Sequence, residues 1–213
     1  MESRQERREE DVARLRCVLA LRAIDATGMG QQQIGVAAGA PGAGKSMLLE
    51  ELRNRGCAVV REAATDVIAS GQAEAVREPW TAPRFVDDVL RLQMQRQVQA
   101  PAAAVVLFDR SLICTLALTR YAGQPSPPQL VEEVDRLVSE GFYERTVLLV
   151  RPLGFIETTA ARRITYADAL AFEAIHESTY REPGFDLVEV APDTVERRVK
   201  AVESLFDGCT NRR

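Results

Sequence analysis

Short apolar runs alternate with longer amphipathic stretches from residue 33 onward, and five of the runs are short and apolar enough to be buried strands. These strands are predicted over residues 33–38, 57–61, 104–108, 146–150 and 187–191. Between them, apolar residues recur at steps of three and four, which is typical of helices. These helices are predicted over residues 45–55, 63–70, 83–99, 111–121, 127–140, 156–164, 166–181 and 193–206. The alternation predicts an α/β fold in which helices cover both faces of a parallel sheet.

The first 28 residues differ from the rest of the chain. A charge-rich run is followed by apolar residues at steps of three and four from Val12 to Ala23, which predicts an amphipathic helix ending at Gly28. Its apolar face could dock on the domain or form a homodimer with a second copy, and Met29 is an alternative start of the protein. We therefore expect a helical extension over residues 1–28 and one domain over residues 29–213.

Composition narrows the class of protein. The chain has 213 residues, 46% hydrophobic and 27% charged, which is typical of a folded domain. Its net charge of −4 argues against nucleic acid or anionic membrane as a partner. No apolar run reaches the ~20 residues of a membrane helix, and the first residues lack a signal-peptide core, so we expect a cytoplasmic protein. The four cysteines lack a zinc-binding spacing, and we expect reduced thiols.

A phosphate-binding motif follows the first predicted strand. Its sequence, GAPGAGKS, matches G-x-x-x-x-G-K-[ST] and precedes a predicted helix. Glycines let backbone N–H groups surround phosphates, and the positive end of the helix dipole adds to the attraction. The predicted nucleotide-binding residues are Gly39, Ala40, Pro41, Gly42, Ala43, Gly44, Lys45, Ser46 and Met47. A glycine-rich turn that binds nothing is the alternative, but Lys45 is one of only two lysines in the chain.

Charged residues follow the other strands at the edge where ligands of such sheets bind. Lys45 is expected to reach the β- and γ-phosphates of ATP or GTP, and Ser46 to bind Mg²⁺. Asp109 follows the apolar run VVLF and is expected to hold Mg²⁺ or accept a proton, with a helix N-cap as the alternative. Arg110 is expected to contact a phosphate or an acceptor rather than solvent.

Acceptor chemistry is expected from the residues that follow the second and fourth strands. Glu62 could orient or deprotonate an acceptor hydroxyl; alternatively it stabilises the first turn of a helix, and Asp66 takes its role. Arg162 and Arg163 lie in a polar helix that could be a lid, where they would neutralise the transferring phosphoryl group and exclude water; an exposed charged helix is the alternative.

Two further residues are less informative. His176, the only histidine, is expected to be structural or exposed rather than catalytic. Trp80 lies in a loop near the predicted site, where it could stack on an acceptor or pack locally.

Taken together, these motifs resemble a known family. The segments GAPGAGKS, RGCAVVREAATDVI, VVLFDRS, AARR and HESTYREPGFDLVEV are similar to AAA-like ATP-binding P-loop domains, which are related to ribosylnicotinamide kinase and to nucleoside and nucleotide kinases. The resemblance covers about residues 33–206 and implies a three-layer sandwich with strand order 2-3-1-4-5, a helical lid and ATP with Mg²⁺ as donor. The chain departs from many relatives at 151–154, which reads RPLG, and at Ser111, where nucleoside kinases are closer.

The favoured function is a small-molecule kinase that moves the γ-phosphate of ATP to a hydroxyl of a nucleoside-like or other metabolite. Its predicted catalytic residues are Lys45, Glu62, Asp109, Arg110, Arg162 and Arg163, with Ser46 and Asp109 as metal ligands. The first alternative is a regulatory NTPase switch with slow hydrolysis, and the second is a remnant that binds nucleotide weakly. A kinase needs an acceptor site, whereas a switch needs only a sensor of the γ-phosphate.

Overall fold

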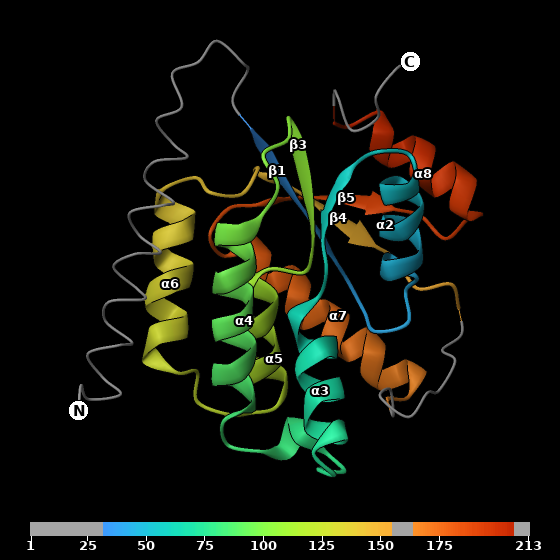
Figure 1. The fold of residues 1–213 in the computed structure, drawn as a ribbon. Helices are drawn as coiled ribbons and strands as arrows, with labels where there is room; N and C mark the ends of the chain where they lie inside the picture. The colour runs from blue at the N-terminus through green and yellow to red at the C-terminus, as the bar shows by residue number, and fades with distance from the viewer. Residues whose placement is uncertain (1–31, 155–163, 207–213) are drawn as a thin grey trace.

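A five-stranded parallel sheet forms the centre of the computed structural model, which describes residues 32–154 and 164–206 (Figure 1). The strands are β1 (Gln33–Ala38), β2 (Ala58–Val60), β3 (Val105–Asp109), β4 (Thr146–Val150) and β5 (Asp186–Val190). Their order across the sheet is β2-β3-β1-β4-β5, and every neighbouring pair is parallel. The predicted fold class and strand order are confirmed.

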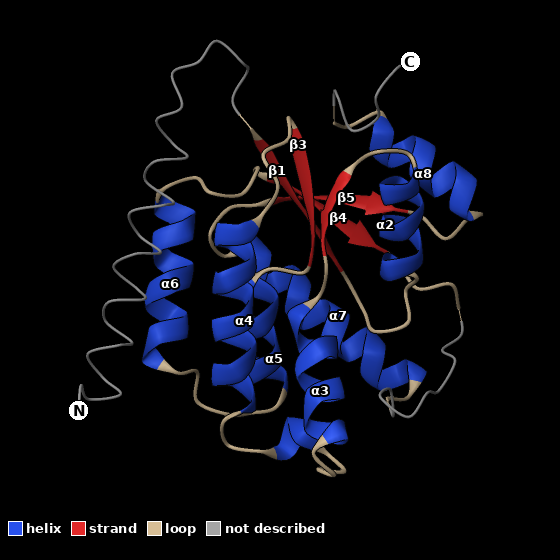
Figure 2. Ribbon diagram, viewed as in Figure 1, coloured by secondary structure: helices blue, strands red, loops and turns tan. Residues whose placement is uncertain are grey.

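Helices lie on both faces of this sheet (Figure 2). One face carries α2 (Lys45–Asn54) and α8 (Val195–Glu203). The other carries α3 (Ala63–Ala73), the short 3₁₀ helix η1 (Pro79–Thr81), α4 (Phe85–Gln99), α5 (Leu112–Tyr121), α6 (Pro128–Ser139) and α7 (Tyr166–Arg181). The predicted helical extension over residues 1–28 lies outside the described residues, as do residues 155–163, where most of the predicted lid helix falls.

Two apolar cores, one on each face, hold the layers together. The core towards α2 and α8 contains Leu48 and Val199, and the core on the opposite face contains Leu112 and Leu137. The central strands β1 and β3 are buried apart from the half-buried Gln33, because helices cover both faces of the sheet. β5 was expected to be equally buried, but Asp186 and Glu189 are exposed because β5 is an edge strand.

Parallel pairing brings the carboxyl ends of the strands to one edge of the sheet. In the register between β1 and β3, Ala37 pairs with Asp109, so the phosphate-binding loop after β1 lies beside the end of β3. The main-chain N–H of Arg110 donates to the carbonyl of Ala37 at 3.1 Å, which fixes this junction. Glu62 and Arg151 follow the ends of the neighbouring strands.

The cysteines differ from expectation in one respect. Cys114 is a buried free thiol, as predicted, but Cys57 is disulfide-bonded. Across the described ranges, every helix is too short or too polar to cross a membrane.

Candidate functional site

The phosphate-binding loop runs between β1 and α2 and needs its glycines. Gly39 has φ +127° and Gly44 has φ +81°, values that side chains rarely adopt. A Cβ atom on Gly39 would lie 2.5 Å from the carbonyl oxygen of Val150, so the loop also passes close to the end of β4. Gly44 is the residue before α2, whose first N–H groups have no partner within the helix. The loop therefore has the backbone geometry of an anion site.

Lys45, the first residue of α2, is folded back onto this loop. Its Nζ donates hydrogen bonds to the carbonyl oxygens of Gly39 at 3.1 Å and Ala40 at 2.7 Å, and the side chain is buried. Burial, and then the positive charge of Arg110, lower the pKa of Lys45 to about 7. A polyanion in the loop would raise this pKa again, because it favours the charged amine.

Ser46 and Asp109 form an oxygen-rich pair beside the loop. The Ser46 hydroxyl donates to Oδ2 of Asp109 at 3.0 Å. In the described part of the chain, Oδ1 of Asp109 is buried and has no hydrogen-bond partner. Burial and the nearby Glu62 raise the pKa of Asp109. The alternative N-cap role falls to Ser111, whose Oγ accepts the Ile113 N–H at 3.1 Å.

These two side chains fit magnesium. A hydroxyl and a carboxylate oxygen without a partner are the hard ligands that Mg²⁺ prefers, and Mg²⁺ commonly takes one or two protein ligands plus substrate phosphates. Within residues 32–154 and 164–206, no cluster of three or more metal-binding side chains offers a complete protein cage.

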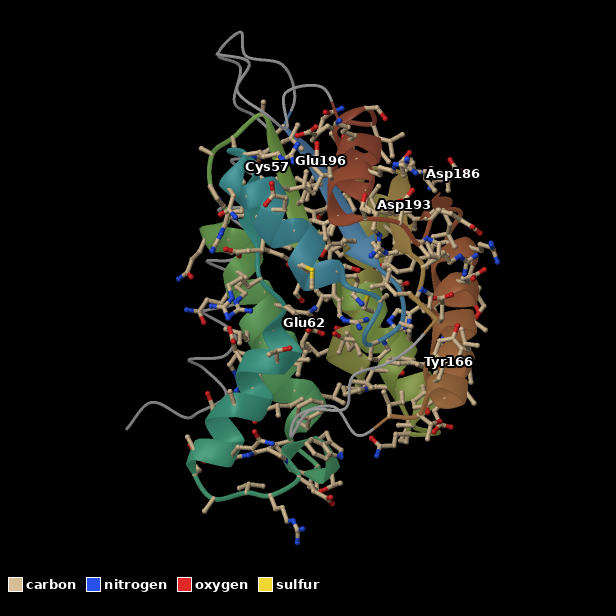
Figure 3. The ribbon with its side chains drawn as sticks, turned by 90° about the vertical axis from the view of Figure 1, so that its right-hand side faces the viewer. Cys57, Glu62, Tyr166, Asp186, Asp193 and Glu196 are labelled. Carbon is tan, nitrogen blue, oxygen red and sulfur yellow. The ribbon has the colours of Figure 1, made fainter. Side chains whose placement is uncertain are left out.

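Glu62 lies at the start of α3, facing the same edge (Figure 3). Its Oε1 is 2.6 Å from Nε of Arg110, and its Oε2 accepts the Thr65 hydroxyl at 2.7 Å. Burial raises the pKa of Glu62, but the charges of Arg110 and Lys45 outweigh it, so the net pKa is lowered. Glu62 makes no side-chain capping bond to the main chain of the helix, and its two carboxylate oxygens instead contact Arg110 and Thr65.

Asp66, the proposed substitute for Glu62, is engaged elsewhere. Its carboxylate accepts a hydrogen bond from Arg96 on α4 and lies 3.6 Å from Arg61. These contacts tie α3 to α4. The structure therefore brings Glu62, rather than Asp66, to the cluster with Lys45.

Arg110 is held in a strained backbone conformation. Its φ is +71°, a value that costs about 1–3 kcal/mol in a residue with a side chain and is common at functional sites. The guanidinium Nη1 is 3.0 Å from Nε2 of His176, whose Nδ1 is 2.9 Å from the carbonyl oxygen of Phe172. A carbonyl oxygen only accepts, so Nδ1 carries the proton and Nε2 accepts from Arg110.

His176 is therefore buried and structural, in line with the expectation, but it also orients a site residue. Burial and the charge of Arg110 lower the pKa of His176 well below 6.5, so the ring is neutral. The contact between His176 on α7 and Arg110 after β3 was not foreseen. No signal in the sequence pairs two residues that lie so far apart in the chain.

A second unforeseen network surrounds Arg151, directly after β4. Its guanidinium pairs with Glu173 at 2.7 Å, Glu177 at 2.5 Å and also Glu189. Glu173 in turn accepts the main-chain N–H of Ala40 at 3.3 Å, so the network ties the phosphate-binding loop to α7. Glu173 and Glu177 resemble an ordinary solvated helix face in the sequence, and Glu189 lies on the edge strand β5, so no local pattern links the three carboxylates.

Two of the remaining candidates, Trp80 and Met47, lie within the described residues. Trp80 packs against a small cluster with Ala63 and Phe85, as local packing requires. The Met47 side chain, at the first turn of α2, is 61% exposed. Arg162 and Arg163 lie outside the described residues.

Comparison with known proteins identifies the family. A family model described as an AAA domain matches residues 35–198, which is more than half of the chain. The chain belongs to this AAA domain family. No curated protein matches this chain by sequence.

Solved structures resemble the AAA domain in fold. The deoxyadenosine kinase from M. mycoides, solved with dCMP and dCDP, is 13% identical over 82% of this chain and 99% of its own, with a TM-score of 0.56. NadR in complex with NR is 14% identical over 85% of this chain, with a TM-score of 0.57. The AAA domain spans 52% of that NadR chain. Family and fold together make this a P-loop AAA domain whose fold is similar to those of deoxyadenosine kinase and NadR.

Proposed function

We propose that the AAA domain is a phosphotransferase that moves the γ-phosphate of ATP to a hydroxyl of a small, nucleoside-like metabolite. The observation that carries the proposal is the pairing of Glu62 with Arg110 at the sheet edge, in the charge cluster that contains Lys45 and Asp109. A nucleotide switch needs a sensor of the γ-phosphate but no carboxylate for an acceptor. A carboxylate held beside the phosphate site therefore favours transfer over switching.

On the donor side, the loop amides and Lys45 bind the phosphates. Lys45 exchanges the carbonyl oxygens of Gly39 and Ala40 for phosphate oxygens and takes up a proton where it was neutral. Ser46 and Asp109 would hold Mg²⁺, which supplies charge neutralisation to the phosphates.

On the acceptor side, Glu62 orients the attacking hydroxyl. Its lowered pKa keeps it ionised at neutral pH, so it accepts a hydrogen bond and receives the proton late, as a loose phosphoryl-transfer transition state allows. Arg110, fixed by Glu62 and His176, stabilises charge on the transferring group. We assign Arg162 and Arg163 the same neutralising role from a lid that excludes water.

A nucleoside-like acceptor is supported by two observations. Ser111 follows the Asp109-Arg110 pair, as in the nucleoside kinase pattern. The two similar folds named above were solved with deoxynucleotides and with NR, respectively. We place the acceptor beside Arg110, which Glu62 and His176 contact at the end of β3.

Nucleotide turnover with a panel of acceptors tests the proposal. The purified full chain is incubated with ATP or GTP and Mg²⁺, alone and with pooled nucleosides, vitamins and amino sugars, and phosphorylated products are identified by mass spectrometry. We expect one acceptor class to stimulate turnover and to appear phosphorylated. Slow hydrolysis that no acceptor changes would instead support a regulatory switch.

A further inference from the structure

Arg198 on α8 is a buried cation that the proposed mechanism does not use. The residue is 3% exposed, and no carboxylate in the described ranges forms an ion pair with it. Its Nη1 donates to the carbonyl oxygen of Ala43 at 3.0 Å and its Nη2 to that of Arg151 at 3.0 Å. Burial lowers the pKa of Arg198, because loss of water disfavours the charged guanidinium.

The hydrogen bond from Arg198 to the Ala43 carbonyl holds one peptide group of the phosphate-binding loop, the one between Ala43 and Gly44. The carbonyl of Ala43 and the N–H of Gly44 belong to the same trans peptide plane and so point in opposite directions. Among the described residues, nothing accepts a hydrogen bond from the Gly44 N–H. With the carbonyl held by Arg198, this N–H is directed away from Arg198 and stays open to a ligand.

The peptide group needs an external anchor because of its glycine. Gly44 has φ +81° and no side chain to limit rotation of the plane that precedes it. A Cβ on Gly44 would lie 3.0 Å from Nη1 of Arg198, so the guanidinium packs directly against the loop at this position. A charge-assisted bond to the carbonyl also polarises the peptide and strengthens its N–H as a donor.

We infer that Arg198 is a positioning residue that fixes the Ala43–Gly44 peptide so that the Gly44 N–H faces the nucleotide phosphates. The inference rests on the proposed nucleotide binding and adds to it a residue of α8, the helix that covers the same face of the sheet as α2. The second bond, to Arg151, anchors the guanidinium to the end of β4, so the loop is held relative to the sheet rather than to α8 alone.

The Gly44 amide can be observed directly by NMR. The sequence has three Ala-Gly pairs, so labelling alanine carbonyls with carbon-13 and glycine nitrogens with nitrogen-15 selects only Gly39, Gly44 and Gly123. Gly123 ends α5 and is an internal reference. Spectra of the full chain are recorded free and with Mg²⁺-ATP, for the wild type, Arg198→Gln and Arg198→Lys. The matched control is Arg197→Gln, on the same helix with its side chain 76% exposed.

In the wild type and in Arg197→Gln we expect Mg²⁺-ATP to move the Gly44 resonance and leave Gly123 in place. In Arg198→Gln the Gly44 resonance should already be displaced in the free protein, and the Kd for Mg²⁺-ATP should rise by about tenfold, as expected for one lost charge-assisted hydrogen bond. Arg198→Lys, which keeps the charge but has one donor nitrogen in place of two, should lie between the two.

The outcomes separate this inference from the proposed function. An Arg198→Gln protein whose free Gly44 resonance and Kd match the wild type overturns the positioning role and leaves nucleotide binding intact. Should the wild type itself not bind Mg²⁺-ATP, the proposed function fails, and the free-state Gly44 resonance alone decides whether Arg198 fixes the peptide. If Arg198→Gln does not fold, Arg198→Lys carries the same comparison.

Discussion

Replacing Lys45 by methionine should remove a pH dependence from the stability of the nucleotide-free protein. The Lys45 amine is buried in the phosphate-binding loop, with a pKa lowered to about 7 from 10.5. In the unfolded chain the amine regains its ordinary pKa. Between these two values the unfolded state therefore holds a proton that the folded state has released, so stability rises with pH. Methionine has a similar length and cannot ionise.

The size of the effect follows from the two pKa values. From pH 7 to about 9.5 the unfolded amine is protonated and the folded amine is not, over roughly 2.5 pH units at about 1.4 kcal/mol per unit. The wild type should therefore gain about 3 kcal/mol relative to Lys45→Met between pH 6 and 9.5. Groups common to both proteins cancel in this difference.

Urea unfolding followed by circular dichroism measures this difference near pH 6 and near pH 9.5. The control is Lys200→Met, which replaces the chain's other lysine, whose side chain is 68% exposed. It should follow the wild type at both pH values. Parallel stability curves for the wild type and Lys45→Met would refute the claim that the amine is buried with a lowered pKa.

Three further predictions concern individual contacts of the site. Glu62→Gln should bind Mg²⁺-ATP with unchanged Kd but transfer phosphate about 10²-fold more slowly in steady-state kinetics, as expected for loss of a positioned acid–base group. Full activity of this variant would show that Glu62 does not orient the acceptor hydroxyl. Gly39→Ala should lose at least about 2 kcal/mol in urea unfolding, because its Cβ would meet a carbonyl oxygen at 2.5 Å, whereas Gly123→Ala, with no atom within 4 Å of its Cβ, should lose less. The nitrogen-15 signal of His176, the only histidine, should remain that of the neutral Nδ1–H tautomer from pH 8 to pH 5.5, and a midpoint near 6.5 would contradict its burial against Arg110.

The fold could be predicted from the sequence because its strands are short and apolar. A strand covered on both faces must be apolar throughout, so the runs over 33–38 and 146–150 coincide with β1 and β4. The run over 187–191 also located β5, but its expected burial was wrong, since an edge strand tolerates exposed carboxylates such as Glu189 and apolar content alone does not locate an edge.

The site could be predicted from the sequence only where its residues lie close together in the chain. The motif places Lys45 and Ser46 by its spacing, because strand, loop and helix are consecutive in the chain. Arg110 contacts Glu62, which precedes it in the chain, and His176, which follows it. These residues belong to elements that only folding brings together. Arg198 carries no signal either, because nothing in the sequence sets it apart from the other arginines, and its burial appears only in the folded structure.

Nucleotide binding is the most direct test of the account. Mg²⁺-ATP and Mg²⁺-GTP are titrated into the full chain in a calorimeter, in two buffers of different ionisation enthalpy, with Lys45→Met as the control. The account predicts one site per chain with proton uptake above pH 7, as phosphates raise the pKa of Lys45, and no binding in the variant. Folded wild-type protein that binds neither nucleotide would contradict it.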